Sequence, residues 1–161
     1  MREPSGSATR FGAIALLLAT AGLLAFWLTQ SHPNDAGGGI TAQAFAAGLE
    51  TMVAAGDTGR RIDGTPVVHP KQGDIYIRAV RWAFYPALEL DPGQSYRLYL
   101  MSEDGVHSAV VAGREVMLLP GQVRMLKLRA PQDGHVPIQC GEYCGLGHSK
   151  MIGSIEVAPG H

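Results

Sequence analysis

Residues 140–151 have the sequence CGEYCGLGHSKM, which places Cys140, Cys144, His148 and Met151 within twelve positions. The chain contains no other cysteine. Two thiolates, an imidazole and a thioether form a soft ligand set, and such a set favours copper over magnesium, calcium or manganese. The stretch therefore predicts a copper-binding loop, and the other strand-like segments are interpreted as the fold that holds it.

The second cysteine of this loop distinguishes it from a mononuclear blue-copper site. Such a site uses one cysteine, two histidines and a weak axial methionine. Cys144 adds a thiolate four positions after Cys140, and a second thiolate allows two metal ions to be bridged. A further donor has to come from elsewhere, and we expect His107, which lies between two strand-like runs.

The pattern Cys-x-Glu-x-Cys-x3-His-x2-Met, preceded by Ser-x-Asp-x-x-His at residues 102–107, resembles the dinuclear copper A domain of cytochrome c oxidase subunit II. The resemblance extends from about residue 74 to residue 157. It implies that Cys140 and Cys144 bridge two copper ions and that His107 and Met151 complete one of them. His148 and the backbone carbonyl of Glu142 would complete the other.

The resemblance also implies a function and partners. The chain would be the electron-entry subunit of a haem-copper terminal oxidase, with no catalysis of its own. It would take electrons from cytochrome c or a similar small donor and pass them to haem in subunit I, where dioxygen is reduced. The resemblance suggests electron entry at Trp82, donor docking near Glu103 and Asp104, and a magnesium ion at the Glu142 carboxylate. Asp104 and Tyr143 are candidates for holding the imidazoles.

Other interpretations of the cysteine pair stay open at this point. A nitric oxide reductase with a copper A subunit would use the same domain. A membrane-anchored copper chaperone of the thioredoxin-like type also carries Cys-x3-Cys, although its histidine lies far downstream and its strands alternate with helices. A structural zinc site would have no use for Met151. A disulfide between the two cysteines is the last alternative, because a chain that reaches an oxidising compartment can keep one.

The N-terminal segment, residues 1–29, is predicted to be a transmembrane anchor. An apolar run without charge extends from Phe11 to Leu28, and as a helix it would be roughly 27 Å long, close to the about 30 Å of a hydrocarbon core. Arg2 and Arg10 precede it, which predicts a cytoplasmic N-terminus and a periplasmic or extracytoplasmic domain in a bacterial plasma membrane. The alternative is a cleaved signal peptide, but the first Ala-x-Ala, residues 42–44, lies well beyond the run. A single span is similar to the anchor of smaller bacterial oxidases of the haem b and a type.

Residues 30–72 are predicted to be a linker with a short helix. Residues 31–39 contain proline, asparagine and three consecutive glycines, which is typical of a linker. Thr41 is a candidate cap for a helix through Ala54, although Gly48 weakens it. Residues 56–73 are turn-rich.

Residues 73–161 are predicted to form the copper domain. Apolar residues alternate in residues 75–84, 96–100 and 126–129, with turn signals at residues 91–93, 120–121 and 133–134. This pattern indicates a small antiparallel sandwich or barrel, and strands over residues 135–139 and 152–157 would enclose the ligand loop. The predicted fold class is all-β, a cupredoxin-like Greek-key sandwich with one N-terminal transmembrane helix. The net charge of −1 and the low content of charged residues argue against nucleic-acid binding.

Overall fold

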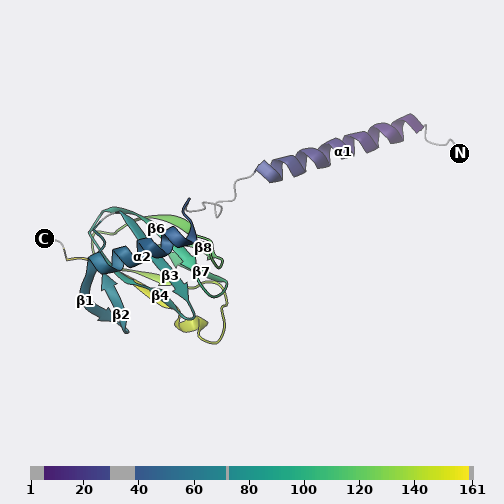
Figure 1. Ribbon diagram of the computed structural model, residues 1–161. Helices are drawn as coiled ribbons and strands as arrows, with labels where there is room; N and C mark the ends of the chain where they lie inside the picture. Colours follow the sequence, from purple (N-terminus) through teal and green to yellow (C-terminus); the bar gives the residue numbers. More distant parts are fainter. Residues whose placement is uncertain (1–5, 30–38, 72, 160–161) are drawn as a thin grey trace. The chain divides into compact units, whose positions relative to one another are not determined.

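The computed structural model describes residues 6–29, 39–71 and 73–159 (Figure 1). The chain divides into two compact units, Met1–Asp35 and Ala36–His161. Most of the predicted linker, residues 31–38, lies outside the described residues.

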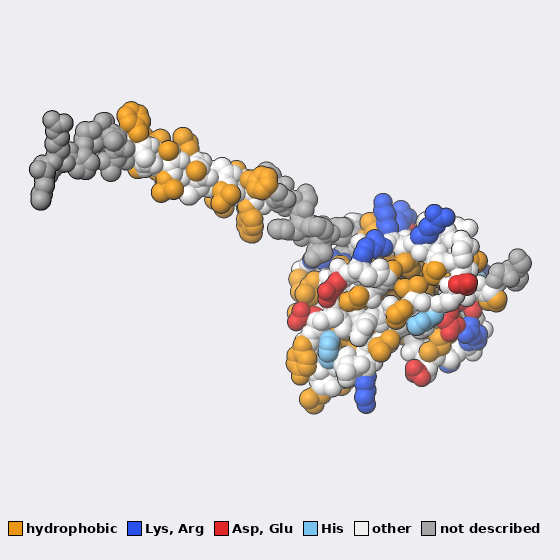
Figure 2. Space-filling model, turned by 180° about the vertical axis from the view of Figure 1, so that it is seen from behind, with side chains coloured by type: hydrophobic (Ala, Val, Ile, Leu, Met, Phe, Trp, Pro, Cys, Tyr) orange, Lys and Arg blue, Asp and Glu red, His pale blue; other side chains and the backbone are white. Residues whose placement is uncertain are grey.

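The first unit contains one helix, α1 (Gly6–Thr29). Its described side chains carry no charge, and hydrophobic ones cover the face seen in Figure 2. The hydroxyl of Thr20 donates to the carbonyl oxygens of Leu16 and Leu17, each at 3.0 Å, so this polar group is satisfied within the helix. Over the residues that the structure describes, no helix combines the length and the apolar character needed to cross a membrane.

The second unit is a sandwich of two β-sheets, which confirms the predicted all-β domain. In spatial order, the larger sheet contains β1 (Asp57–Ile62), β2 (Thr65–Val68), β5 (Ala87–Leu90), β11 (Ile152–Val157), β10 (His135–Gln139), β7 (His107–Val111) and β8 (Arg114–Leu118). The smaller sheet contains β4 (Ala83–Tyr85), β3 (Asp74–Val80), β6 (Ser95–Ser102) and β9 (Arg124–Arg129).

The core lies between the inward faces of the two sheets. In β3 the residues Ile75, Ile77 and Ala79 are fully buried and alternate with partly buried residues, which agrees with the predicted strand. Leu98 and Leu100 of β6 lie in the same core and are also fully buried. The larger sheet contributes, among others, Leu88, Leu90, Val111, Leu118, Ile138 and Ile155.

Three strand pairs are parallel, namely β3 with β6, β2 with β5, and β5 with β11. The prediction of an antiparallel sandwich is wrong for these pairs. The chain places β4 and β6 in the smaller sheet but β5 in the larger one, so it crosses between the sheets on both sides of β5. A crossover lets a strand return in the same direction as its neighbour, whereas a hairpin reverses it.

The outer face of the smaller sheet is covered by α2 (Ala42–Gly56), as Figure 1 shows. The predicted cap is confirmed, because the backbone N–H of Ala44 donates to the Thr41 hydroxyl at 3.1 Å. Phe45 and Leu49 are buried in a second cluster with Tyr99 and Met101. This layer explains why β6 is buried on both faces, unlike a strand with one solvated face.

Gly48 has a packing role that its helix propensity does not reveal. A Cβ atom at this position would lie only 2.5 Å from Cζ of Tyr76 on β3. Glycine therefore allows α2 to approach the sheet and lets the Tyr76 ring lie against the helix. The ring contacts Phe45 edge-on, with centroids 5.7 Å apart.

Residues 56–73, which the composition indicated to be turn-rich, contain the β1–β2 hairpin. Its turn is Asp63-Gly64, where both residues have positive φ angles of 48° and 81°. Asp-Gly is a strong signal for a tight hairpin turn. The guanidinium of Arg60 on β1 pairs with Glu89 at 2.5 Å and with Glu156 at 2.6 Å, which ties the hairpin to β5 and β11.

Candidate metal centre

The loop of residues 140–151 is held between two paired strands. Strands β10 and β11 are antiparallel neighbours, with Gln139 opposite Ile152. The backbone N–H of Cys140 donates to the carbonyl oxygen of Met151 at 3.1 Å, so the two ends of the loop are joined directly. This arrangement confirms the predicted strands on both sides of the loop, and it limits the movement of any ligand that the loop carries.

Within the loop, a short 3₁₀ turn, η1 (His148–Lys150), positions the last two candidate ligands, His148 and Met151. The backbone N–H of His148 donates to the carbonyl oxygen of Gly145 at 3.0 Å, and that of Met151 donates to the carbonyl oxygen of His148 at 3.1 Å. Gly145 has a φ angle of +118°, which side-chain-bearing residues rarely adopt. Met151 is fully buried, and His148 is half-buried.

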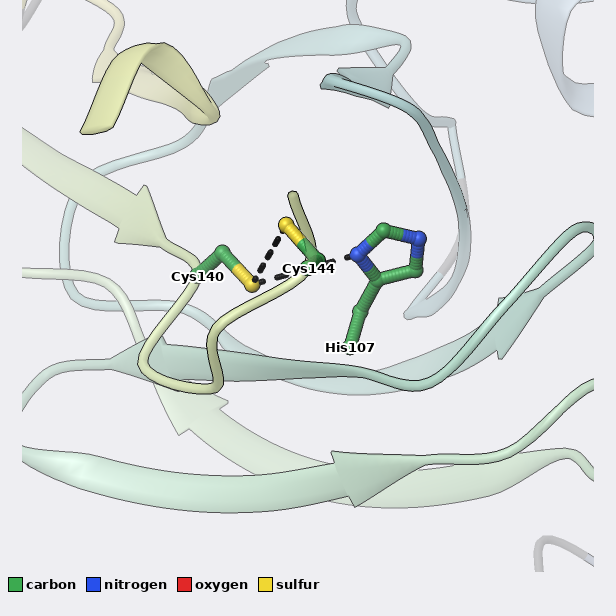
Figure 3. Close-up of side chains that lie close together, drawn as sticks. All are labelled: His107, Cys140 and Cys144. Atoms are coloured by element: carbon green, nitrogen blue, oxygen red, sulfur yellow. Dashed lines mark hydrogen bonds between the residues drawn. The ribbon is translucent and has the colours of Figure 1, made fainter. Parts of the chain in front are cut away.

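His107 approaches the loop from β7, the strand beside β10 in the larger sheet. It is the first residue of β7, and its imidazole is fully buried. Its Nδ1 atom lies 3.9 Å from the Cys140 sulfur, and Figure 3 shows the ring pointing toward the two cysteines. The structure therefore brings the upstream histidine to the loop as expected, although His107 begins strand β7 and does not lie in a loop between strands.

All six predicted ligand residues converge on the two sulfur atoms, which lie 3.7 Å apart. Beside the Cys140 sulfur lie Nδ1 of His107 and, at 3.1 Å, the carbonyl oxygen of Glu142. Beside the Cys144 sulfur lie Nδ1 of His148 and Sδ of Met151, each at 3.7 Å. The donor atoms of His107, Cys140 and Cys144 all lie within 4.8 Å of one another.

These distances fit a shared metal site and not a disulfide. Two sulfurs that each lie about 2.3 Å from one tetrahedral metal ion are separated by about 3.7 Å. A disulfide would require about 2.05 Å, and both cysteines are free. The thioether of Met151 is a soft donor that copper accepts, so the donor set fits copper.

Asp104 holds the His107 ring from behind. One carboxylate oxygen lies 3.0 Å from Nε2 of His107, and the other accepts the Arg81 backbone N–H at 2.9 Å. With Nε2 engaged, Nδ1 is the ring atom that faces Cys140. Burial acts to raise the pKa of the Asp104 carboxyl, but the hydrogen bonds from Arg81 and His107 together lower it below its ordinary value.

Trp82 lies directly on the ligand loop. Its indole Nε1 donates to the carbonyl oxygen of Cys144 at 3.2 Å. The ring also covers Gly147, where a Cβ atom would collide with it, and 40% of the side chain is exposed. The structure therefore joins the predicted electron-entry residue to a candidate cysteine ligand, and the role of Trp82 in electron entry stays a prediction.

Three other residues singled out from the sequence, Tyr143, Glu103 and Glu142, lie at the surface near the site. The ring of Tyr143 lies against His148, with centroids 5.8 Å apart, and is 72% exposed. Glu103 pairs with Arg78 at 3.2 Å, so neither it nor Asp104 presents a bare carboxylate. Glu142 is exposed, and only its carbonyl oxygen faces the Cys140 sulfur.

Sequence reasoning missed Ser108. Its side chain is fully buried, and its hydroxyl accepts the backbone N–H of Gly141 at 2.8 Å. The available signal was a polar residue beside a candidate ligand, next to the apolar run of residues 109–111.

Burial raises the pKa of the Cys144 thiol from 9.0 to about 11, and the neighbouring Cys140 thiol adds to this effect. In the metal-free protein this thiol is therefore protonated at neutral pH. A metal ion that binds the thiolate must displace its proton.

No family model matches the chain. Cytochrome c oxidase subunit 2 of Thermus thermophilus is 33% identical over 91 residues, which cover 55% of this chain and 67% of the relative. A second protein of that name from Thermus thermophilus is also 33% identical over 91 residues, and the match covers 54% of its length.

Two solved structures show a similar fold. A haem-copper terminal oxidase dimer, determined by cryo-electron microscopy, aligns with a TM-score of 0.51 and 21% identity over 96% of this chain and 100% of that chain. A rusticyanin variant aligns with a TM-score of 0.51 and 15% identity over 74% of this chain and 95% of that chain. At these identities the likeness concerns the fold, and it confirms the predicted cupredoxin-like sandwich.

Proposed function

Because the chain belongs to the cytochrome c oxidase subunit II family, we propose that its sandwich holds a dinuclear copper centre and receives electrons from a cytochrome c or a similar small donor. Membership makes the chain the electron-entry subunit of a haem-copper terminal oxidase, which is an oxidoreductase complex. Electrons would leave the centre for haem in the catalytic subunit, where dioxygen is reduced.

The observation that carries this proposal is the paired arrangement of donors around the two sulfurs. Each cysteine sulfur has one imidazole nitrogen beside it, and each has one further weak donor, a carbonyl oxygen or a thioether. Two thiolates 3.7 Å apart would each bridge both ions, and the four remaining donors would be shared as the resemblance implies, His107 and Met151 to one ion and His148 and the Glu142 carbonyl to the other. Copper ions held in this way supply a one-electron redox centre.

The chain contributes a rigid mount for that centre. The loop ends are joined by the bond between Cys140 and Met151, and Asp104 fixes the His107 ring. A mount that holds the same ligand positions in both oxidation states reduces the rearrangement that each electron transfer requires. The described donors would fill the coordination positions of the ions, so no position would be left for a substrate. This favours electron transfer over substrate binding.

Electron entry through Trp82 is supported by its position between solvent and ligand loop. The indole is partly exposed on one side and bonded to the Cys144 carbonyl on the other. Tyr143 and Leu146, which are 72% and 94% exposed, add apolar surface on the same loop. An electron donor that docks on this part of the surface would lie close to Cys144.

The membrane anchor remains part of the proposal. The described side chains of α1 from Phe11 to Trp27 are uncharged, and its large apolar side chains are exposed. A helix whose described side chains are uncharged and mostly apolar is suited to a lipid environment. We propose a single-pass protein with a cytoplasmic N-terminus in a bacterial plasma membrane, testable by extraction with carbonate and by reporter fusions at each end.

The proposed magnesium ion at Glu142 has a separate test. The residue is exposed, so its carboxylate is available to a neighbouring subunit. In the assembled oxidase, manganese substituted for magnesium should give a resonance signal that E142Q abolishes while copper is retained. An unchanged manganese signal in E142Q would remove the site.

The copper content of the purified full-length chain tests the proposed function. We expect two copper ions per chain, and a lower content after C140S or C144S, because each thiolate contributes to both ions. H135N is the matched control, since His135 is an exposed histidine of β10 outside the donor set. One ion per chain, or a content that H135N lowers as much as C144S does, would contradict the proposal.

A further inference from the structure

A buried serine links the strand of one ligand to the loop of the others. Ser108 follows His107 on β7 and is fully buried. Its hydroxyl donates to Oε1 of Glu115 at 2.6 Å and accepts the backbone N–H of Gly141 at 2.8 Å. Gly141 is the residue after Cys140, so this hydroxyl holds the first peptide of the ligand loop.

The register of the β7–β8 hairpin places the two side chains together. Ser108 pairs with Met117, and Val110 pairs with Glu115. Residues at alternate positions share a face, so Ser108 and Glu115 are diagonal neighbours on one side of the hairpin. The Ser108 hydroxyl donates its hydrogen bond to the Glu115 carboxylate. A lone pair of the Ser108 oxygen is therefore left to accept the hydrogen bond from the Gly141 N–H.

The absence of a side chain at Gly141 leaves room for the side chains of Ser108 and Glu115. A Cβ atom at this position would lie 3.0 Å from the Ser108 hydroxyl oxygen and 3.1 Å from Cδ of Glu115, and it would collide with Oε1. A residue with a side chain would therefore displace the loop or the carboxylate. The absence of a side chain allows the carboxylate to lie against the backbone immediately after Cys140.

We infer that Ser108 and Glu115 are positioning residues of the copper site, which hold the Cys140–Gly141 peptide and place a negative charge beside it. This inference rests on the proposed function. The oxidised copper pair carries one more positive charge than the reduced pair. A carboxylate close to the bridging thiolate therefore favours the oxidised state and lowers the reduction potential. Glu115 is exposed on its outer side, so solvent weakens this effect without removing it.

The test uses the full chain in detergent, with and without copper. E115Q keeps an acceptor for the Ser108 hydroxyl but removes the charge, so the copper spectrum should stay unchanged while the reduction potential rises. S108A removes the partner of the Gly141 N–H, so copper loss to a chelator should become about tenfold faster. E50Q is the matched control, because Glu50 is an exposed glutamate on α2.

A second measurement does not depend on copper. In the metal-free chain, hydrogen exchange at the Gly141 amide should become about tenfold faster in S108A. E115A should accelerate this exchange less than S108A does. The E115A variant tests the contact between Ser108 and Glu115 without altering a buried residue. Unchanged exchange in both variants would overturn the positioning role, and a potential in E115Q that shifts no more than in E50Q would overturn the role of the charge. A wild-type chain that binds no copper pair would instead contradict the proposed function. The exchange result would still show whether Ser108 holds the Gly141 amide.

Discussion

The indole nitrogen of Trp82 donates a hydrogen bond to the backbone carbonyl of Cys144, 62 positions away in the sequence, at 3.2 Å. This bond joins the loop between β3 and β4 to the ligand loop. It also connects a partly exposed aromatic ring to a residue whose sulfur lies in the donor set. The proposed electron entry and the loop geometry therefore involve the same side chain, and substitutions can separate the two effects.

Replacing Trp82 tests its role in electron entry. W82F removes the indole donor and W82A removes the ring, so we expect electron transfer from reduced cytochrome c to fall in both. In W82A the loss should be about tenfold or more, equivalent to about 1.4 kcal/mol of barrier. Stopped-flow kinetics would measure this rate, and the optical copper bands would serve as the control. Wild-type kinetics with an intact copper spectrum would remove Trp82 from the electron path.

Replacing Gly147 tests the contact of the Trp82 ring with the loop. In G147A the new methyl group would overlap the ring, so the free energy of unfolding should decrease by about 1–3 kcal/mol. The matched control is G73A, because a Cβ atom there meets only Ser95 at an ordinary 3.6 Å. Adding W82A to G147A should recover part of the loss. Denaturant unfolding of the wild type, G147A, G73A, W82A and the double variant measures these effects, and additive effects of W82A and G147A would contradict the contact.

Asp104 provides a test of ligand orientation. D104A leaves Nε2 of His107 and the Arg81 N–H without their shared acceptor, so copper affinity should fall by about 10–100-fold. Competition with a copper chelator would measure this affinity. E103Q is the control, because Glu103 is the adjacent acidic residue but pairs with Arg78 instead. Equal affinities in D104A and E103Q would show that the His107 ring is held by its own packing.

The Cys144 thiol predicts a pH dependence of the metal-free protein. Its pKa rises from 9.0 to about 11 in the folded state, so the folded state binds the proton more tightly than the unfolded state. The resulting stability is present below about pH 9 and is lost as the pH rises toward about 11. Comparing thermal unfolding of the wild type and C144S would separate this effect from Tyr76 and Tyr96, whose pKa values are also raised by burial. A parallel decline in both proteins would contradict it.

Local patterns predicted the parts of the fold that depend on neighbouring residues. Alternation identified β3 as a strand, and Thr41 identified the start of α2. The spacing from Cys140 to Met151 selected donors that the folded loop does bring together. These features are local because a strand face, a helix cap and a tight ligand loop are each determined within a few residues.

Features that depend on distant contacts could not be predicted in the same way. Alternation shows which face of a strand is buried but not which strand lies beside it, so the parallel pairs were missed. Gly48 looked unfavourable because the approach of Tyr76 is invisible in the sequence. The β1–β2 hairpin is different, since Asp63-Gly64 was an available turn signal that the composition of the segment obscured.

The central claim is that Cys140 and Cys144 hold two copper ions that share one unpaired electron. Electron paramagnetic resonance of the copper-loaded full chain tests it most directly. We predict a purple protein whose hyperfine pattern comes from two equivalent copper nuclei, and which loses that pattern in C140S and in C144S. A signal from a single copper nucleus, or a pattern that survives the loss of either thiolate, would contradict it.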